Sequence, residues 1–182
     1  MTRPLTDDRD ILAAARSGSE DAGRALVAAH GPSMLRTAWH VLGSYGRNDA
    51  EDVVQEAFIA ALTTPALPDG DVGAWLRAIT ARKALDAMRG VQRRAEGPLP
   101  LSEAGALELA ADSPATVETL SVREALQKLS PSDRAVLVLV DLYGHSMSEA
   151  AIALGATSVG TRLRAVRARR KLAKLLRRGE ST

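Results

Sequence analysis

The stretch MSEAAIALGATSVGTRLRAVRARRKLAKLLRR, residues 147–178, decides the fold of the C-terminal part of the chain. Residues 147–154 have the composition of a short helix, and Gly155 turns the chain. Thr157 or Ser158 then caps a long helix that runs to about residue 178. A short helix, a glycine-containing turn and a long basic helix are typical of a helix-turn-helix motif, whose second helix lies in the major groove of DNA.

Basic side chains almost ring the last helix. Residues 157–182 contain nine Lys or Arg and one acid, Glu180. Arginine suits a nucleic-acid partner because its planar guanidinium pairs with phosphates and with the O6 and N7 edge of guanine. A solvated charged helix is the alternative, but nine cations without a neighbouring acid would repel one another. We expect Arg162 and Arg164 to reach base edges, and the later cations to meet phosphates or water.

Two apolar rows are possible along the same helix, and the sequence leaves open which of them packs against the protein. A helix has 3.6 residues per turn, so residues three or four apart share a face. One row is Thr161, Ala165, Ala168 and Leu172, and the other is Val159, Leu163 and Val166.

Composition extends the helical prediction to the whole chain. Hydrophobic residues make up 46% of the 182 residues, but only two Trp, two Tyr and one Phe are present. The core is therefore built from Ala, Leu, Val and Ile, of which Ala and Leu favour helices. We predict an all-α protein of two small helical domains joined by an acidic flexible linker, with the helix-turn-helix in the C-terminal domain.

The residue inventory excludes several classes of site. The chain has no Cys and only three scattered His, so we predict no disulfide, metal site or cofactor. We predict no catalytic residue and no enzyme, because no carboxylate pair, nucleophile–base set or phosphate-cradling glycine loop has supporting context. The polar, acidic first residues do not resemble a signal peptide, and the longest apolar run, residues 135–140, is too short to cross a bilayer. These features predict a cytoplasmic protein without membrane insertion.

Helix and loop signals divide the chain into a first domain of residues 1–94, a linker of residues 95–116 and a second domain of residues 117–182. Residues 95–121 contain five acids and no base, together with Pro, Gly and Ser, which is typical of a linker. In the first domain we predict helices over residues 7–29 with a break near 17–19, over 32–42 with Pro32 in the first turn, over about 49–62 and over 72–94. In the second domain we predict helices over 117–129, 131–143, 147–154 and about 158–178.

Acids and amides gather on one face of the third predicted helix, in the segment DAEDVVQEAF, residues 49–58. Acids at a helix start are ordinary capping, so their chemistry alone does not distinguish a binding face from a cap. The segment, however, resembles the polymerase-binding signature of extracytoplasmic-function sigma factors. The resemblance implies that Asp49, Asp52, Gln55 and Phe58 lie at or near a contact with core RNA polymerase.

The fourth predicted helix resembles the promoter-melting helix of the same family. Its motifs are GAWLRAI, residues 73–79, ALDAMR, residues 84–89, and QRR, residues 92–94. Trp75, Leu76 and Ile79 are more typical of a core than of a ligand site. The family commonly has Asn at the position of Arg82, and the preceding loop, residues 63–71, matches the family loop that holds a flipped-out base. The residues that the resemblance assigns to the minus-ten element are Arg77, Arg82, Lys83, Asp86 and Arg89.

The segment ALQKLSPSDRAVLVL, residues 125–139, resembles the opening of the family's second DNA-binding domain, which reads the minus-thirty-five element. The family's Ser-Val-Gly-Thr is present at residues 158–161, displaced by one residue from its usual register. Ile152 stands where the family usually has a polar residue. The residues predicted at the minus-thirty-five element are Thr157, Ser158, Arg162, Arg164 and Arg167.

The resemblance covers residues 7–94 and 117–177 in the expected order, and implies an alternative sigma factor that directs core RNA polymerase to promoter DNA. It also implies an anti-sigma partner, and a linker that threads the polymerase cleft or serves as a simple tether. Two alternatives stay open on the sequence alone. One is a free-standing helix-turn-helix regulator, and the other is a sigma-like decoy that binds polymerase or an anti-sigma factor without initiating.

Overall fold

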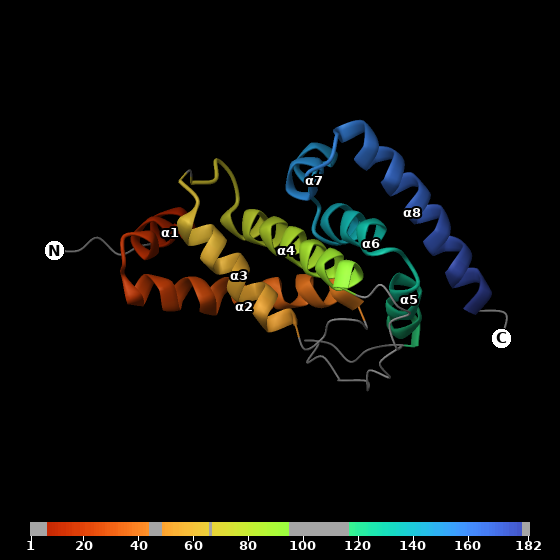
Figure 1. Cartoon of the computed structure of the whole chain (residues 1–182), viewed down its shortest axis with the longest axis horizontal. Helices are drawn as coiled ribbons and strands as arrows, with labels where there is room; N and C mark the ends of the chain where they lie inside the picture. Colours follow the sequence, from red (N-terminus) through yellow and green to blue (C-terminus); the bar gives the residue numbers. More distant parts are fainter. Residues whose placement is uncertain (1–6, 44–48, 66, 95–116, 180–182) are drawn as a thin grey trace.

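The computed structural model describes residues 7–43, 49–65, 67–94 and 117–179, and all regular structure within these ranges is helical. The all-α prediction is confirmed. The first half contains α1 (Asp8–Arg16), α2 (Glu20–Leu42), α3 (Ala50–Thr63) and α4 (Val72–Arg94). The second half contains α5 (Val117–Gln127), α6 (Pro131–Leu137), the π-helical segment η2 (Val138–Leu142), α7 (Met147–Leu154) and α8 (Ser158–Gly179), as Figure 1 shows. The predicted acidic linker, residues 95–116, lies outside the described residues.

Side-chain caps start most of these helices where the sequence predicts them. The Ser19 hydroxyl accepts a hydrogen bond from the backbone N–H of Ala22 at 3.3 Å, directly after the predicted break between α1 and α2. Ser146 and Glu149 form a reciprocal capping box at the start of α7. These bonds satisfy backbone donors that a helix start leaves unpaired, so short polar residues fix the helix boundaries.

The predicted helix start at Pro32 is wrong, because α2 runs unbroken from Glu20 to Leu42 with Pro32 in its interior. Proline removes one backbone donor and crowds the preceding turn. In α2 this residue lies on the exposed side, while Leu26 and Met34 on either side of it are buried. Burial of the opposite face therefore outweighs the local cost of the proline.

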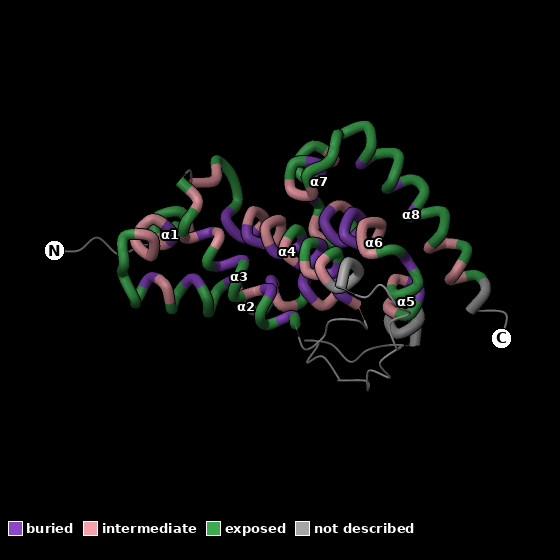
Figure 2. The backbone as a smooth tube through the Cα atoms, viewed as in Figure 1, coloured by how far each residue is buried: buried purple, intermediate pink, exposed green. Residues whose placement is uncertain are grey.

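Three hydrophobic clusters hold the helices together. One lies within the first half and includes Leu12, Leu26, Met34 and Leu76. A small one, of Leu129, Leu137 and Ala168, lies beneath α8. The third contains buried residues from both halves, as the purple segments at the centre of Figure 2 indicate. Its members from the first half are Ala38, Val41, Leu42, Ala50, Val53, Ala81, Ala84, Leu85 and Met88, and those from the second half are Ala135, Val138, Leu139 and Ala150.

A buried cation lies at the junction of the two halves. Arg134 of α6 is only 2% exposed, and its guanidinium fills the space that a Cβ atom on Gly43 would occupy. Gly43 ends α2 with φ +65°, a conformation that disfavours residues with a side chain. Tyr143 adds a long hydrogen bond from its hydroxyl to the carbonyl of Ser33, at 3.5 Å. The second half therefore packs against the C-terminal end of α2 through a contact that requires glycine.

We predict that Gly43→Ala destabilises the protein more than Gly18→Ala. Both glycines have positive φ, but a Cβ on Gly18 would meet no atom within 4 Å, whereas one on Gly43 would overlap Arg134. Each variant carries a backbone strain of roughly 1–3 kcal/mol, and only Gly43→Ala also displaces the buried arginine. Urea unfolding followed by circular dichroism measures both free energies. Equal losses in the two variants would contradict the contact.

Candidate nucleic-acid interface

The acidic face predicted on α3 is exposed. Asp49, Asp52 and Gln55 are all exposed, and the exposed Ile59 lies one turn beyond Gln55 on the same side of the helix. Asp49 occupies the N-cap position, but its side chain makes no capping hydrogen bond. Its carboxylate is therefore not used by the helix itself.

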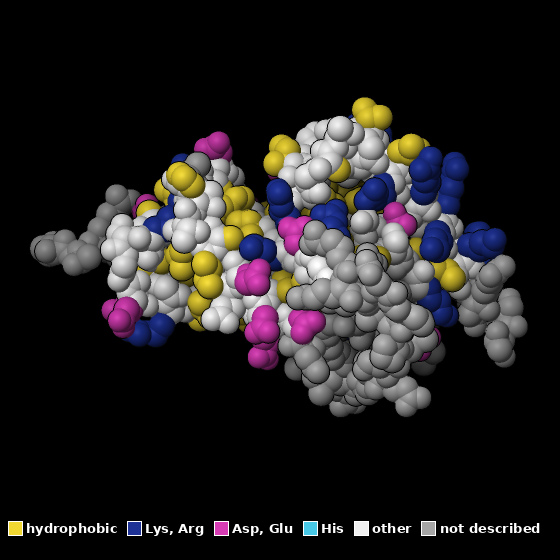
Figure 3. Space-filling view, in the orientation of Figure 1, with side chains coloured by type: hydrophobic (Ala, Val, Ile, Leu, Met, Phe, Trp, Pro, Cys, Tyr) yellow, Lys and Arg dark blue, Asp and Glu magenta, His cyan; other side chains and the backbone are white. Residues whose placement is uncertain are grey.

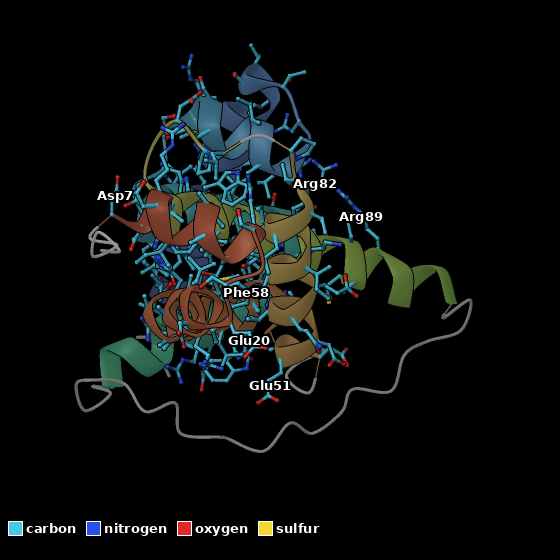
Figure 4. The ribbon with its side chains drawn as sticks, turned by 90° about the vertical axis from the view of Figure 1, so that its left-hand side faces the viewer. Asp7, Glu20, Glu51, Phe58, Arg82 and Arg89 are labelled. Carbon is cyan, nitrogen blue, oxygen red and sulfur yellow. The ribbon has the colours of Figure 1, made fainter. Side chains whose placement is uncertain are left out.

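Phe58 differs from the other residues predicted for polymerase contact. It is 9% exposed and belongs to the hydrophobic cluster of the first half. Figure 4 shows Phe58 directed into the body of the protein, whereas Glu51 of the same helix points away from it. In this structure Phe58 supports α3 from beneath and does not form part of its exposed face.

The exposed side of α4 carries three of the residues predicted at the minus-ten element. Arg82, Asp86 and Arg89 are exposed and lie one turn apart, and Arg89 donates to Asp86 at 3.0 Å. Figure 4 shows Arg82 and Arg89 directed away from the body. Lys83 is half-buried and its Nζ lies 3.3 Å from a carboxylate oxygen of Glu56 in α3. The structure thus brings these four residues to neighbouring positions on one helix.

Arg77 lies apart from that group, at the junction of the two halves. Its guanidinium carbon lies 4.9 Å from the centre of the Tyr143 ring, which is a cation–π distance. Its Nη2 lies 3.9 Å from a carboxylate oxygen of Asp71. Arg77 is therefore engaged by the second half and by the loop before α4, and faces a different side from Arg82.

A groove of about 610 Å³ separates α4 from α7. The loop before α4 forms one wall, and Asp71 of that loop caps α4 by accepting a hydrogen bond from the backbone N–H of Ala74. The lining is mostly apolar, and it includes charged groups from both helices. The residues of α4 and α7 in this lining include Trp75, Ile79, Arg82, Asp86, Glu149, Ile152 and Ala153.

The structure decides between the two apolar rows of α8. Thr161, Ala165 and Ala168 are buried at 0–1% exposure and face the rest of the second half. The other row, Val159, Leu163 and Val166, is 78%, 49% and 37% exposed, and we call it the exposed apolar row. The sequence could not separate these rows because both have helical spacing.

The cations of α8 are exposed around this helix, and Figure 3 shows dark blue side chains gathered along it. Arg162, Arg164 and Arg167 are exposed, as predicted for residues that meet DNA. Thr157 caps the helix by accepting from the backbone N–H of Gly160 at 3.1 Å, and Ser158 is its exposed first residue. Of the five residues predicted at the minus-thirty-five element, Thr157 and Ser158 therefore form the start of α8, and the three arginines place positive charge on its surface.

One contact that the sequence analysis missed orients α8. Arg169 donates two hydrogen bonds to the carboxylate of Asp141, at 3.0 and 2.5 Å. These bonds raise the pKa of Arg169 above its ordinary value. The partners are 28 residues apart in the sequence, so no local pattern reveals the pair. It connects the long helix to η2 and removes one cation from the set that is free to meet DNA.

Comparison with known proteins identifies the family to which this chain belongs. Residues 26–94 match the Sigma-70 region 2 family, and residues 119–172 match the Sigma-70, region 4 family. The chain is 33% identical over 172 residues to the ECF RNA polymerase sigma factor SigM of Mycobacterium tuberculosis, covering 93% of this chain and 84% of SigM. It is 35% identical over 188 residues to the RNA polymerase sigma factor CnrH of Cupriavidus metallidurans, covering 95% and 96%. The chain is an extracytoplasmic-function sigma factor.

Two solved structures share the fold of this sigma factor. The sigma factor RpoE from Bartonella quintana, in complex with the anti-sigma factor NepR, aligns with a TM-score of 0.68 and 24% identity, covering 87% of this chain and 98% of RpoE. CnrH in complex with the cytosolic domain of CnrY aligns with a TM-score of 0.59 and 32% identity, covering 93% and 96%.

Family membership confirms the predicted function. This sigma factor directs core RNA polymerase to promoters, and it is a transcription initiation factor rather than an enzyme. The presence of both regions favours this role over a free-standing helix-turn-helix regulator. Among the described residues no helix has the length and hydrophobicity needed to cross a membrane, and no group of three His, Asp or Glu residues could hold a metal ion.

Two histidines at the junction have lowered pKa values. Burial, followed by the charges of Arg123, Arg36 and Arg134, lowers the pKa of His40 from its ordinary value of 6.5. Burial and the charge of Arg77 lower the pKa of His145, although Glu149 and Asp71 act in the opposite direction. At both positions the folded environment therefore disfavours the protonated form of the imidazole.

We predict that acid weakens this fold and that His40→Gln reduces the effect. The unfolded chain binds a proton at His40 more readily than the folded chain does, so its stabilising contribution is complete above pH 6.5 and is lost as the pH falls toward the lowered pKa. Urea unfolding at steps between about pH 7.5 and 5.5 measures the slope. A variant with the same slope as the wild type would show that His40 is not responsible.

Proposed function

We propose that this sigma factor divides promoter initiation among three exposed faces. Residues 1–94 bind core polymerase and the minus-ten element, residues 117–182 bind the minus-thirty-five element, and residues 95–116 connect them. The observation that carries the proposal is the separation of charge. Acids lie on the exposed side of α3, a mixed basic group lies on α4, and exposed cations lie along α8.

The α3 face suits a basic surface on core polymerase. Asp49, Asp52 and Gln55 present carboxylates and an amide, and the exposed Ile59 adds an apolar contact beside them. Interfaces of this kind combine an apolar centre with a polar rim. Buried Phe58 contributes indirectly, because it fixes the position of α3 on the first half.

The exposed side of α4 suits the opened minus-ten region. Arg82 and Arg89 offer charge to the phosphates of a single strand, and the lining of the adjoining groove includes the apolar side chains of Trp75 and Ile79. Bases released from a duplex stack on aromatic side chains and on arginine planes. Lys83 and Asp86 complete the basic group, and Arg77 joins it once the second half has moved away from α4.

The two halves must separate before both promoter elements are bound. The elements lie about 25 base pairs apart by their names, which corresponds to about 85 Å of duplex at 3.4 Å per base pair. In this structure α7 and α4 line one groove. The helix-turn-helix and α4, which we propose bind the two promoter elements, therefore lie within a few helix diameters of each other. We propose that the packed arrangement belongs to the free protein, and that core polymerase binds the separated form.

An anti-sigma factor is the partner we propose for the packed arrangement, acting in the cytoplasm. The solved structure of RpoE contains the anti-sigma factor NepR, and that of CnrH contains the cytosolic domain of CnrY. Both similar chains were therefore captured with a regulatory or cytosolic partner. A protein that holds the two halves together would keep this chain from polymerase.

We predict that the purified chain, added to core RNA polymerase and a genomic promoter pool, produces discrete run-off transcripts whose starts share two upstream elements. Asp52→Arg should lower transcript yield about tenfold at limiting protein, because it places like charge against the basic surface that we propose. Binding of the chain to core without new transcripts would favour the sigma-like decoy.

The matched control is Glu20→Arg. Glu20 and Asp52 are both exposed acids in the first turn of a helix, so reversing either charge has a similar cost through the helix dipole. Glu20 begins α2, whose N-terminal end lies at the left of the molecule in Figure 1, whereas α3 begins near the centre. Equal losses of transcription in the two variants would indicate destabilised helices and contradict the polymerase contact.

We predict that core polymerase increases the distance between the two halves. The chain has no Cys, so Val27→Cys in α2 and Glu124→Cys in α5 give two unique sites for fluorescent labels, both exposed. Energy transfer should be higher in the free protein and fall on addition of core. Transfer that stays constant through core binding would contradict the separation.

A further inference from the structure

The base-reading centre of α8 is apolar, and we propose that it recognises thymine methyl groups in the minus-thirty-five element. The exposed apolar row, Val159, Leu163 and Val166, would lie on the floor of the major groove. This inference rests on the proposed function, because it takes α8 to be the helix that enters the groove. It changes the expected basis of specificity from arginine–guanine pairing to contacts with methyl groups.

The first step is the orientation of α8. Thr161, Ala165 and Ala168 are buried, so they define the side of the helix that faces the protein. At about 100° per residue, Val159 and Leu163 lie on the opposite side, the one that projects furthest from the second half. A recognition helix inserts that projecting side into the groove, with its N-terminal residues nearest the bases. Val159 and Leu163 belong to the first two turns of α8.

The second step is the extent of the apolar surface. Single exposed aliphatic residues are common and need no explanation. Here three of them follow one another at intervals of four and three residues, with exposures of 78%, 49% and 37%. Neighbours at this spacing form a continuous strip on a helix. The strip therefore favours a partner with apolar groups of its own.

The third step is charge. Arg162 and Arg167 lie on the two flanks of the row, Arg164 lies nearer the buried side of the helix, and Arg170 continues beyond the row, all exposed. No acid occurs among residues 158–179 of α8. The surface thus has an apolar centre between cationic edges. The major groove has the complementary pattern, because phosphates form its two rims and thymine methyl groups project from its floor.

Geometry agrees with this assignment. A helix with its side chains is about 10–12 Å across, and the major groove is about 12 Å wide. With the row on the floor, Arg162 and Arg167 point toward the walls, where phosphates and the edges of adjacent bases are within reach. In this arrangement the arginines position the helix, and the row distinguishes A·T from G·C pairs.

The test begins with holoenzyme assembled from core polymerase and the full chain. A promoter found by run-off transcription is rebuilt with a randomised minus-thirty-five window, and bound fragments are sequenced. We expect A·T pairs at two or more positions of the window. Deoxyuridine then replaces thymidine at each of these positions, which removes the methyl group and leaves every hydrogen-bonding group in place. Binding should fall about fourfold for each methyl group in contact, the loss expected for one buried carbon.

Side-chain variants connect the methyl effect to the row. Leu163→Ala and Val159→Ala should weaken binding to the thymine promoter and abolish the further loss caused by deoxyuridine. Both residues are exposed, so neither substitution opens a cavity in the core, and circular dichroism checks the fold. Val27→Ala, which removes an exposed aliphatic from α2, is the control and should leave both effects unchanged. Arg162→Ala should weaken binding while keeping the full deoxyuridine effect.

Three results would overturn the proposal. One is an upstream window without any sequence preference, and another is a preference that is insensitive to deoxyuridine. The third is a Leu163→Ala variant that loses affinity for core polymerase or an anti-sigma factor and keeps its promoter preference, since the row would then be a protein interface. Failure of the wild-type chain to support any transcription would instead refute the proposed function, so the two failures are distinguishable.

Discussion

The packing of Arg134 against the end of α2 constrains both halves of the molecule. A buried guanidinium loses several kcal/mol of hydration, which only suitable partners restore. The C-terminal end of a helix is one such environment, because its dipole favours positive charge. Gly43 leaves the space that the cation occupies, and the cluster shared by the two halves surrounds the contact. Separation of the halves would expose buried apolar surface to water, which is unfavourable, and would rehydrate Arg134, which is favourable. Because the two changes oppose each other, the junction is suited to opening.

The same junction holds or borders residues that are predicted to bind the promoter. Arg77 is held between the Tyr143 ring and Asp71, and α7 lines the groove beside Arg82. In this arrangement one predicted minus-ten residue, Arg77, is engaged in other contacts, and α7 restricts the space beside the others. Separation of the halves would expose Arg77 and widen the groove in one step. The proposed separation would therefore couple core binding to DNA binding through contacts that no single helix contains.

Local signals in the sequence predicted most of the fold, and tertiary packing explains the rest. The limits of α7, the break near residues 17–19 and a cap at Thr157 or Ser158 depend on residues within one turn, so they were predicted from the sequence. Pro32 misled the prediction because burial on the far side of α2 outweighs a local preference. At the site, the family motif identified α3 and α4 but could not separate inward from outward residues. Phe58 therefore proved to be buried, and Arg77 faces the junction.

The orientation of α8 shows how packing on one side of a helix determines chemistry on the other. Thr161, Ala165 and Ala168 are small, and they allow α8 to lie close to α6 and α7. Turning the helix to bury Leu163 would force a larger side chain into that space, and overpacking of this kind typically costs about 1–3 kcal/mol. The larger aliphatic residues must therefore face outward, between the arginines. Close packing beneath α8 and an apolar strip on its projecting side are two consequences of the same spacing.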